Sequence, residues 1–320
     1  MNVREGLLQE RIDPALTPAV LSEIAGEALG APARVRSWTP LTGGCWNRVI
    51  GLQGDAGVER VVLKIAPSPG DAGLAREHDV LRWFAERTRL PVPRPFMIDA
   101  TGARIPGTFL AMSRVSGRPL HEVYDRLDDE ERRQITIRIA SDLAELHTST
   151  ARGFGGVELP ESARGDWPSF WLPRFDAVMA EVSGSGLLDP RFLARIEAVR
   201  PRLPRVLDIG ERSTLTHYDI WSGNIMVDWS GRSAQVSGYL DVPGFWADPV
   251  RELSFAEMFG IADPLFYSVY TSAHTLAAGW QLRRDLYNLK MHLKHITMYP
   301  GERYYREGAA RCLLSVEAGC

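Results

Sequence analysis

The sequence predicts an α+β protein whose first part is rich in strands and whose larger second part is mainly helical. Short apolar runs with β-branched residues recur in the first part, and most later apolar residues repeat at helical spacing. A glycine and a proline within residues 116–119 separate the two parts. We therefore expect two domains, residues 1–115 and residues 116–320.

The first part is expected to begin with a helix. Thr17 followed by Pro18 is typical of an N-cap and a first-turn proline, and an apolar stripe continues to about Leu29. A second helix is expected over residues 71–87. Strands are expected near residues 33–38, 47–53, 60–66, 95–100 and 107–114.

Lysine usage points to one residue of the first part. The chain holds only Lys64, Lys290 and Lys294, against a combined Lys+Arg count of 37. Lys64 lies in an apolar strand, where a charge is costly without a partner, and Glu77 interrupts the apolar stripe of the next helix. We predict a buried ion pair that directs the ammonium toward nucleotide phosphates. A surface lysine with a solvated glutamate is the alternative.

A glycine turn precedes the second strand. Backbone N–H groups of Gly43 and Gly44 could lie over phosphates, although Gly-Gly before a strand is most often only a turn.

The second part is expected to be helical apart from one hairpin. The expected helices cover residues 128–148, 167–182, 190–199, 249–259, 264–276, 281–299 and 302–316. Residues 183–186, Ser-Gly-Ser-Gly, are expected to form a loop. Trp167, Trp171 and Phe175 fall at helical spacing and are expected in the core.

The segment from His217 to Asn224, followed by Asp241, carries the strongest functional signal. In H-x-D-x-x-x-x-N chemistry the aspartate, here Asp219, accepts the proton of an attacking hydroxyl. Asn224 and Asp241 would hold magnesium against phosphates. The H-x-D triplet alone occurs by chance, but apolar runs on both sides of residues 229–233 predict a hairpin that brings the two ligands together.

Several other polar residues are expected to have structural roles. His147 and His217 are expected to organise the segment around Asp219 rather than to act in catalysis. Asp248, followed by proline, is expected to cap a helix. His292 and His295, with Lys290 and Lys294, are expected to form a solvated helix face.

On these motifs the chain resembles the aminoglycoside phosphotransferase family, the small-molecule branch of the protein-kinase-like fold. The resemblance spans residues 41–47, the strand of Lys64, Glu77, residues 111–120, 143–147, 217–224 and 241–249. The variant Trp221-Ser222-Gly223-Asn224 is similar to fructosamine kinases.

The resemblance implies a two-lobed kinase-like fold, with a β-rich nucleotide-binding N-lobe and a larger, mainly helical C-lobe that carries the acceptor site. It also implies ATP and Mg²⁺ as cofactors, with GTP left open. Adenine is expected to bind the backbone of Ser113 and Val115, which leaves their side chains free to vary. Ser113 replaces a glutamate that is common in the family, and the backbone is expected to carry that role. Tyr218 stands where the family usually has glycine, which would crowd the loop. Asp241-Val242-Pro243 replaces the Asp-Phe-Gly of protein kinases, so protein kinase activity is not expected.

Composition limits the classes of protein to which the chain can belong. A formal net charge of −3 argues against a dedicated nucleic-acid binder, and no apolar run is long enough for a membrane span, so a cytoplasmic protein is expected. Cys45, Cys312 and Cys320 are expected as reduced thiols. Residues 1–115 carry 14 basic and 12 acidic residues and residues 116–320 carry 23 and 28, a slight preference for cationic substrates.

The expected reaction is transfer of the γ-phosphoryl group to a hydroxyl of a small polar molecule. The abundance of Arg, Ala, Gly and Pro suggests a GC-rich genome, as in antibiotic producers, and favours a cationic aminoglycoside or a cyclic-peptide antibiotic as acceptor, with resistance as the outcome. A metabolic kinase acting on a sugar, a fructosamine or an amino alcohol is the alternative. A protein that sequesters ligands without transfer is a third, but it would need no proton acceptor such as Asp219.

Overall fold

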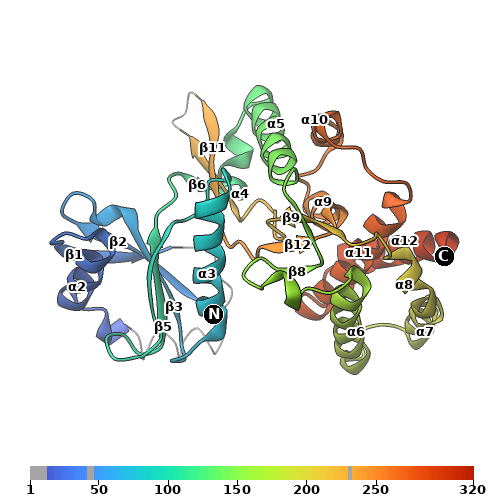
Figure 1. The fold of residues 1–320 in the computed structure, drawn as a ribbon, viewed down its shortest axis with the longest axis horizontal. Coiled ribbons are helices and arrows are strands. Elements are labelled where there is room, and N and C mark those ends of the chain that lie inside the picture. Colours follow the sequence, from blue (N-terminus) through green and yellow to red (C-terminus); the bar gives the residue numbers. More distant parts are fainter. Residues whose placement is uncertain (1–12, 42–46, 230–232) are drawn as a thin grey trace. The chain divides into compact units, whose positions relative to one another are not determined.

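The computed structural model describes residues 13–41, 47–229 and 233–320 (Figure 1). The chain divides into two compact units. The first unit contains the described residues up to Arg126 together with Gly223–Val242, and the second contains Leu127–Ser222 and Pro243–Cys320. The boundary between the packed units lies after Arg126, whereas the sequence predicted it after residue 115. The predicted hairpin belongs to the first unit.

The first unit is built on an antiparallel five-stranded sheet with the strand order β1-β2-β3-β5-β4. Its strands are β1 (Val35–Pro40), β2 (Arg48–Gly54), β3 (Val61–Ala66), β4 (Pro95–Asp99) and β5 (Thr108–Ser113). A three-stranded sheet with the order β11-β10-β6 combines β6 (Arg118–Pro119), β10 (Ile225–Trp229) and β11 (Ala234–Tyr239). The predicted strands and the predicted hairpin are confirmed.

Helices α2 (Pro18–Leu29) and α3 (Ala72–Arg87) lie on either side of the five-stranded sheet (Figure 1). Thr17 caps α2 as predicted, because its hydroxyl accepts a hydrogen bond from the N–H of Val20. Alternate side chains of a strand point to opposite faces, so Leu63 packs into the core with Leu21 and Ile24 of α2 while Lys64 faces the other way. A short helix, α4 (Leu120–Val123), completes the described helices of this unit.

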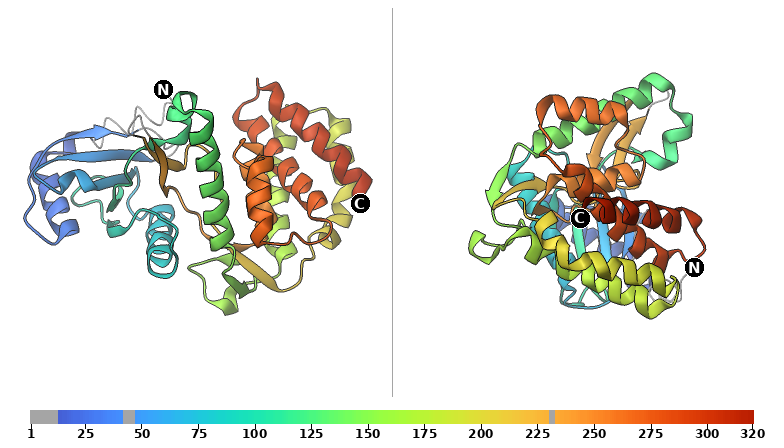
Figure 2. Two further views of the ribbon diagram at one scale, coloured as in Figure 1. Left: turned by 90° about the horizontal axis from the view of Figure 1, so that it is seen from above. Right: turned by 90° about the vertical axis from the view of Figure 1, so that its right-hand side faces the viewer.

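The second unit is mainly helical. Its helices are α5 (Asp129–Leu146), α6 (Trp167–Ser185), α7 (Pro190–Val199), α8 (Leu203–Val206), α9 (Pro249–Met258), α10 (Pro264–Ala273), α11 (Trp280–Met298) and α12 (Arg303–Gly319). Helices α11 and α12 lie side by side (Figures 1 and 2). As predicted, Trp167, Trp171 and Phe175 of α6 are buried, in a core shared with Leu286 and Leu289 of α11.

The second unit also holds a four-stranded antiparallel sheet that the sequence did not predict. Its order is β7-β9-β12-β8, from β7 (Thr150–Arg152), β8 (Gly155–Gly156), β9 (Arg212–Thr216) and β12 (Phe245–Ala247). Strands β9 and β12 flank the functional segment, one ending at Thr216 and the other beginning at Phe245. The sheet therefore fixes both ends of residues 217–244, the segment that carries Asp219.

Two local predictions were wrong. Residues 183–185 continue helix α6 instead of forming a loop, and the helix ends at Gly186, whose φ of 66° suits a residue without a side chain. The face of α11 expected in solvent is also largely covered. His292 is 4% exposed and packs closely on Gly308 of α12. A Cβ on Gly308 would lie 2.2 Å from the imidazole ring of His292.

Candidate nucleotide pocket and catalytic loop

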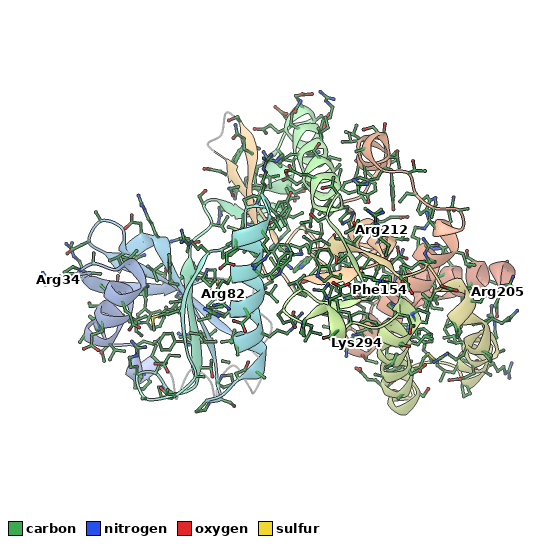
Figure 3. All side chains as sticks on the ribbon, viewed as in Figure 1. Arg34, Arg82, Phe154, Arg205, Arg212 and Lys294 are labelled. Atoms are coloured by element: carbon green, nitrogen blue, oxygen red, sulfur yellow. The ribbon has the colours of Figure 1, made fainter. Side chains whose placement is uncertain are left out.

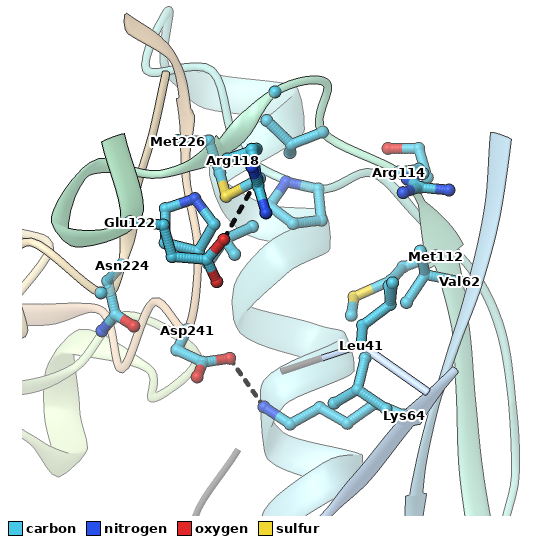
Figure 4. Close-up of a pocket in the computed structure, with 18 of the residues that line it drawn as sticks. Leu41, Val62, Lys64, Met112, Arg114, Arg118, Glu122, Asn224, Met226 and Asp241 are labelled. Atoms are coloured by element: carbon cyan, nitrogen blue, oxygen red, sulfur yellow. Dashed lines mark hydrogen bonds and ion pairs between the residues drawn. The ribbon is translucent and has the colours of Figure 1, made fainter. Parts of the chain in front are cut away.

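Lys64 lies at the centre of a charged cluster in the first unit. Its Nζ lies 2.9 Å from the carboxylate of Glu77 on α3. It also lies 2.8 Å from Oδ1 of Asp241, which follows β11 (Figure 4). Lys64 is 7% exposed, so its ammonium has exchanged water for these two carboxylates. The ion pair predicted between Lys64 and Glu77 is present, and Asp241 joins it.

The charges of this cluster do not cancel, because two carboxylates share one ammonium. Burial alone would lower the pKa of Lys64, but Asp241 and Glu77 outweigh it and raise that pKa, so the lysine stays charged. Burial raises the pKa of Glu77, and the attraction of Lys64 only partly opposes it. The cluster therefore has an excess of negative charge, which a bound cation would neutralise.

Asn224 and Asp241 stand at the two outer ends of the β10–β11 hairpin. The backbone N–H of Leu240 donates to the carbonyl of Asn224 at 2.8 Å, which holds the two residues at the same end. Both side chains line one pocket (Figure 4). Asp241 has a φ of 51°, a left-handed backbone that aspartate tolerates better than most residues.

This donor set fits a magnesium ion that arrives with a nucleotide. Among the residues that the structure describes, no group of three or more His, Cys, Asp or Glu side chains could hold a metal ion by itself. One carboxylate and one amide oxygen leave several positions of an octahedral ion for phosphate oxygens and water, which is how Mg²⁺ commonly binds in nucleotide sites.

The pocket around these residues has a volume of about 290 Å³ and lies wholly within the first unit. Lys64, Glu77, Asn224 and Asp241 line one part of it, and its apolar walls come from Leu41, Val49, Val62, Met112, Met226 and Leu240. Ser113 and Val115 also line it. An apolar slot with charged groups at one end suits a flat base attached to phosphates.

The hydroxyl of Ser113, and not its backbone carbonyl, accepts the hydrogen bond from the neighbouring Arg94. Its N–H donates to the carbonyl of Arg94 at 2.8 Å, whereas the N–H of Arg94 donates to the hydroxyl of Ser113 at 2.7 Å. The side chain thus takes the donor that a regular antiparallel ladder would give to the carbonyl. The carbonyl of Ser113 is left able to accept a hydrogen bond from a ligand.

Gly117 explains how the segment after Ser113 approaches the hairpin. It has a φ of 89°, and a Cβ there would lie 2.2 Å from the carbonyl oxygen of Val227. Only glycine fits this close approach. Gly43 and Gly44, the predicted phosphate-binding turn, lie outside the described residues.

Asp219 belongs to the second unit, on the loop between β9 and the hairpin. Its N–H donates to Nδ1 of the buried His217 at 3.2 Å, so His217 acts as the loop organiser that the sequence predicted. Tyr218 between them has a φ of 83°, in the region that favours glycine. Its ring lies 4.6 Å from that of Phe245, and the Arg251 guanidinium lies 4.0 Å from its centroid.

A carboxylate that the sequence did not single out supports this strained loop. Glu252 of α9 is fully buried and accepts hydrogen bonds from the backbone N–H groups of His217 and Tyr218. It also contacts Nε2 of His147 at 2.7 Å, while Nδ1 of His147 meets the hydroxyl of Tyr270 at 2.7 Å. Burial alone would raise the pKa of Glu252, but the hydrogen bond and charge of His147 lower it.

Asp248 caps α9 as predicted, since its Oδ1 accepts the N–H of Val250 at 3.1 Å. It does more than the sequence indicated. Its Oδ2 accepts hydrogen bonds from Arg283 and from the hydroxyl of Tyr287, both at 2.7 Å. Because those partners belong to α11, Asp248 ties the segment after Asp241 to the core of the second unit.

The fold and this pocket define a kinase that phosphorylates small molecules. A model described as the phosphotransferase enzyme family matches residues 37–242, well over half of the chain. The chain belongs to this family. Within the residues that the structure describes, no helix is both long enough and apolar enough to cross a membrane.

Individual relatives agree with this assignment. A probable ketoamine kinase from Synechocystis is 24% identical over 298 residues, which cover 90% of this chain and 94% of that protein. A putative fructosamine-3-kinase from Thermobifida fusca has a crystal structure with a TM-score of 0.70 at 20% identity, covering 95% of this chain and 99% of that one. An ADP-bound aminoglycoside phosphotransferase has a TM-score of 0.63 at 14% identity, with coverage of 95% and 99%.

Proposed function

We propose that this protein transfers the γ-phosphoryl group of ATP to a hydroxyl of a ketoamine, the adduct of a sugar with an amine. The observation that carries the transfer is the convergence of Lys64, Glu77, Asn224 and Asp241 in one pocket. Phosphoryl transfer requires mainly positioning and neutralisation of phosphate charge. Lys64 supplies one positive charge, and Asn224 and Asp241 could hold the Mg²⁺ ion that supplies the rest.

Each polar group of the pocket has a proposed task. The carbonyl of Ser113 and the N–H of Val115 bind the adenine edge, and GTP is the alternative phosphoryl donor. Lys64, oriented by Glu77, binds phosphate oxygens. Gly43 and Gly44 are proposed to cover the phosphates. Mg²⁺, held by Asn224 and Asp241, neutralises charge on the phosphates when bound.

Asp219 is proposed to accept the proton of the attacking hydroxyl. Its backbone N–H is held by Nδ1 of His217, and Glu252 holds the N–H groups of the two preceding residues. A fixed backbone limits where the carboxylate can reach, which is what a general base needs.

Similarity to ketoamine kinases over nearly the whole chain favours a ketoamine as acceptor. The cationic antibiotic expected from composition stays a prediction, because the aminoglycoside phosphotransferases support it by fold alone. Each of these acceptors would offer a hydroxyl, so the chemistry proposed for Asp219 is the same in either case.

One assay tests the proposal. Purified protein is incubated with Mg²⁺ and either ATP or GTP, together with a ketoamine of glucose, the free sugar and a set of aminoglycosides, and products are analysed by mass spectrometry. We expect one added phosphoryl group on the ketoamine. Asp219→Asn should lower kcat by about 10²–10⁴-fold and leave nucleotide affinity unchanged. Phosphorylation of aminoglycosides alone would replace the proposed acceptor, and an unchanged kcat in Asp219→Asn would remove its role as base.

A further inference from the structure

Three cations of the second unit, on helices α6, α9 and α11, have no carboxylate partner among the residues that the structure describes, and α11 packs against both other helices. They are Arg174 on α6, Arg251 on α9 and Lys290 on α11, called here the cation cluster. Arg251 is 6% exposed, and its guanidinium donates to the carbonyl oxygen of Tyr218 at 3.2 Å and to the sulfur of Met291 at 3.8 Å. Neither partner is charged.

The other two members are no better neutralised. Arg174 donates to the carbonyl of Phe170 and lies 3.8 Å from the centroid of that ring. Lys290 lies 6.0 Å from the centroid of Trp171 and forms no ion pair with any residue in the described parts of the chain. Burial, followed by the charges of Arg251, Arg174 and Lys294, lowers the pKa of Lys290 to about 7.

Lys294 shows the ordinary alternative one turn further along α11. Its Nζ binds the carboxylate of Glu181 at 2.7 Å, and it is labelled in Figure 3. The like charges of the buried Arg251 and the half-buried Lys290 repel one another, whereas the exposed Arg174 is screened by solvent. Cation–π contacts offset only part of that cost. An anion bound between Arg251 and Lys290 would relieve the repulsion. Charge arrangements that oppose stability in this way are characteristic of functional sites.

We propose that the cation cluster binds an anionic group of the acceptor, a carboxylate or a phosphate. The inference rests on the proposed function and specifies its substrate class. Arg251 contacts the carbonyl of the peptide bond that joins Tyr218 to Asp219, so an anion held there lies beside the proposed base. The preferred ketoamine is then one that keeps a negative charge, such as the adduct of a sugar with a free amino acid. This reverses the preference for cationic acceptors that the charge balance suggested.

The test compares acceptors that differ in charge alone. The adduct of glucose with glycine carries a carboxylate, the adduct with glycinamide does not, and the adduct of glucose 6-phosphate with glycinamide carries a phosphate instead. We expect wild-type protein to prefer one charged adduct over the neutral one by about 10- to 100-fold in kcat/KM, the effect of a charged hydrogen bond. Which charged adduct is preferred identifies the source of the anion.

Lys290→Met should reduce that preference to near unity by lowering kcat/KM for the charged adducts. Lys290 is chosen because it donates no hydrogen bond to the rest of the described chain, so its loss should not disturb folding. Lys294→Gln is the matched control, since it removes a neighbouring cation that already has a carboxylate partner, and it should keep the preference. Equal kcat/KM for charged and neutral adducts in wild-type protein refutes the inference.

A second readout does not depend on turnover. The chain has three lysines, so reductive ¹³C-methylation yields few NMR signals, and Lys290→Met assigns one of them. The glycine adduct or inorganic phosphate should shift the Lys290 signal and raise its pKa. If ketoamines are phosphorylated but neither probe shifts this signal, the inference fails and the proposed function stands. If no ketoamine is phosphorylated but a probe shifts the signal, the anion site stands and the proposed function fails.

Discussion

Glu252→Gln should loosen the loop that carries Asp219. In the wild-type protein the Glu252 carboxylate is fully buried and accepts from two backbone N–H groups, besides contacting His147. Glutamine keeps the shape but replaces one acceptor oxygen by an NH₂ group, which faces a donor. A charged hydrogen bond contributes about 1.5–3 kcal/mol, so one or two lost contacts should lower the free energy of unfolding by about 1.5–6 kcal/mol.

The measurement is urea unfolding followed by tryptophan fluorescence, together with steady-state kinetics. The folded pKa of Glu252 is lowered, so its ionisation stabilises the protein above about pH 4.5, and this contribution is lost as pH falls through the lowered pKa. Glu252→Gln should therefore lose stability at neutral pH and show a shallower decline in acid. Its kcat should also fall, because Asp219 is held through this loop.

Glu257→Gln on the same helix is the matched control. Glu257 is partly exposed and accepts from the hydroxyl of Tyr267 at 2.8 Å, with no contact to the loop. Glu257→Gln should lower the free energy of unfolding by less than about 1 kcal/mol and leave kcat unchanged. If the two variants lose equal stability, or if Glu252→Gln keeps wild-type kcat, the support that we assign to Glu252 is wrong.

Three further predictions concern the pocket of the first unit. Asp241→Ala should weaken Mg²⁺-dependent nucleotide binding and abolish transfer, so equal MgATP affinity by calorimetry with surviving activity would exclude it as a ligand. Lys64→Arg should fold nearly normally but fail in catalysis, because a planar guanidinium replaces a compact ammonium. Lys64→Met should also lose about 2–4 kcal/mol of stability by leaving Glu77 and Asp241 without their cation, and equal melting temperatures for the two variants would contradict the buried pair. Ser113→Ala should raise KM for the nucleotide about 2- to 10-fold at unchanged kcat, since the N–H of Arg94 would then compete for the carbonyl, whereas an unchanged KM would show that the carbonyl does not bind adenine.

Features encoded over a few consecutive residues could be predicted from the sequence. The Thr17 cap, the Asp248 cap and the β10–β11 hairpin each depend on neighbours in the chain, and all three are present. The four-stranded sheet was missed because its strands have two to five residues, some polar, and are defined only by pairing with distant segments. Such short strands leave little periodicity to detect.

The site shows the same division. Lys64 and Glu77 could be paired from sequence because the partners lie on consecutive elements. Glu252 gave no signal, since its role depends on the loop at His217 and on His147, which lie 35 and 105 residues away in the chain. The burial of His292 was missed because α11 packs against α6, α9 and α12, so it has no broad solvent face of the kind that an amphipathic pattern assumes.

The division of the chain has a consequence for the order of folding during synthesis. Residues up to Arg126 form most of the first unit, but its hairpin follows only at Gly223–Val242. An emerging chain can therefore build the five-stranded sheet early, yet the nucleotide pocket stays incomplete until the ribosome has passed Asp241. A fragment that ends before the hairpin would contain Lys64 and Glu77 but neither Asn224 nor Asp241. The growing chain thus acquires its proposed magnesium ligands only after Leu127–Ser222 of the second unit has been made.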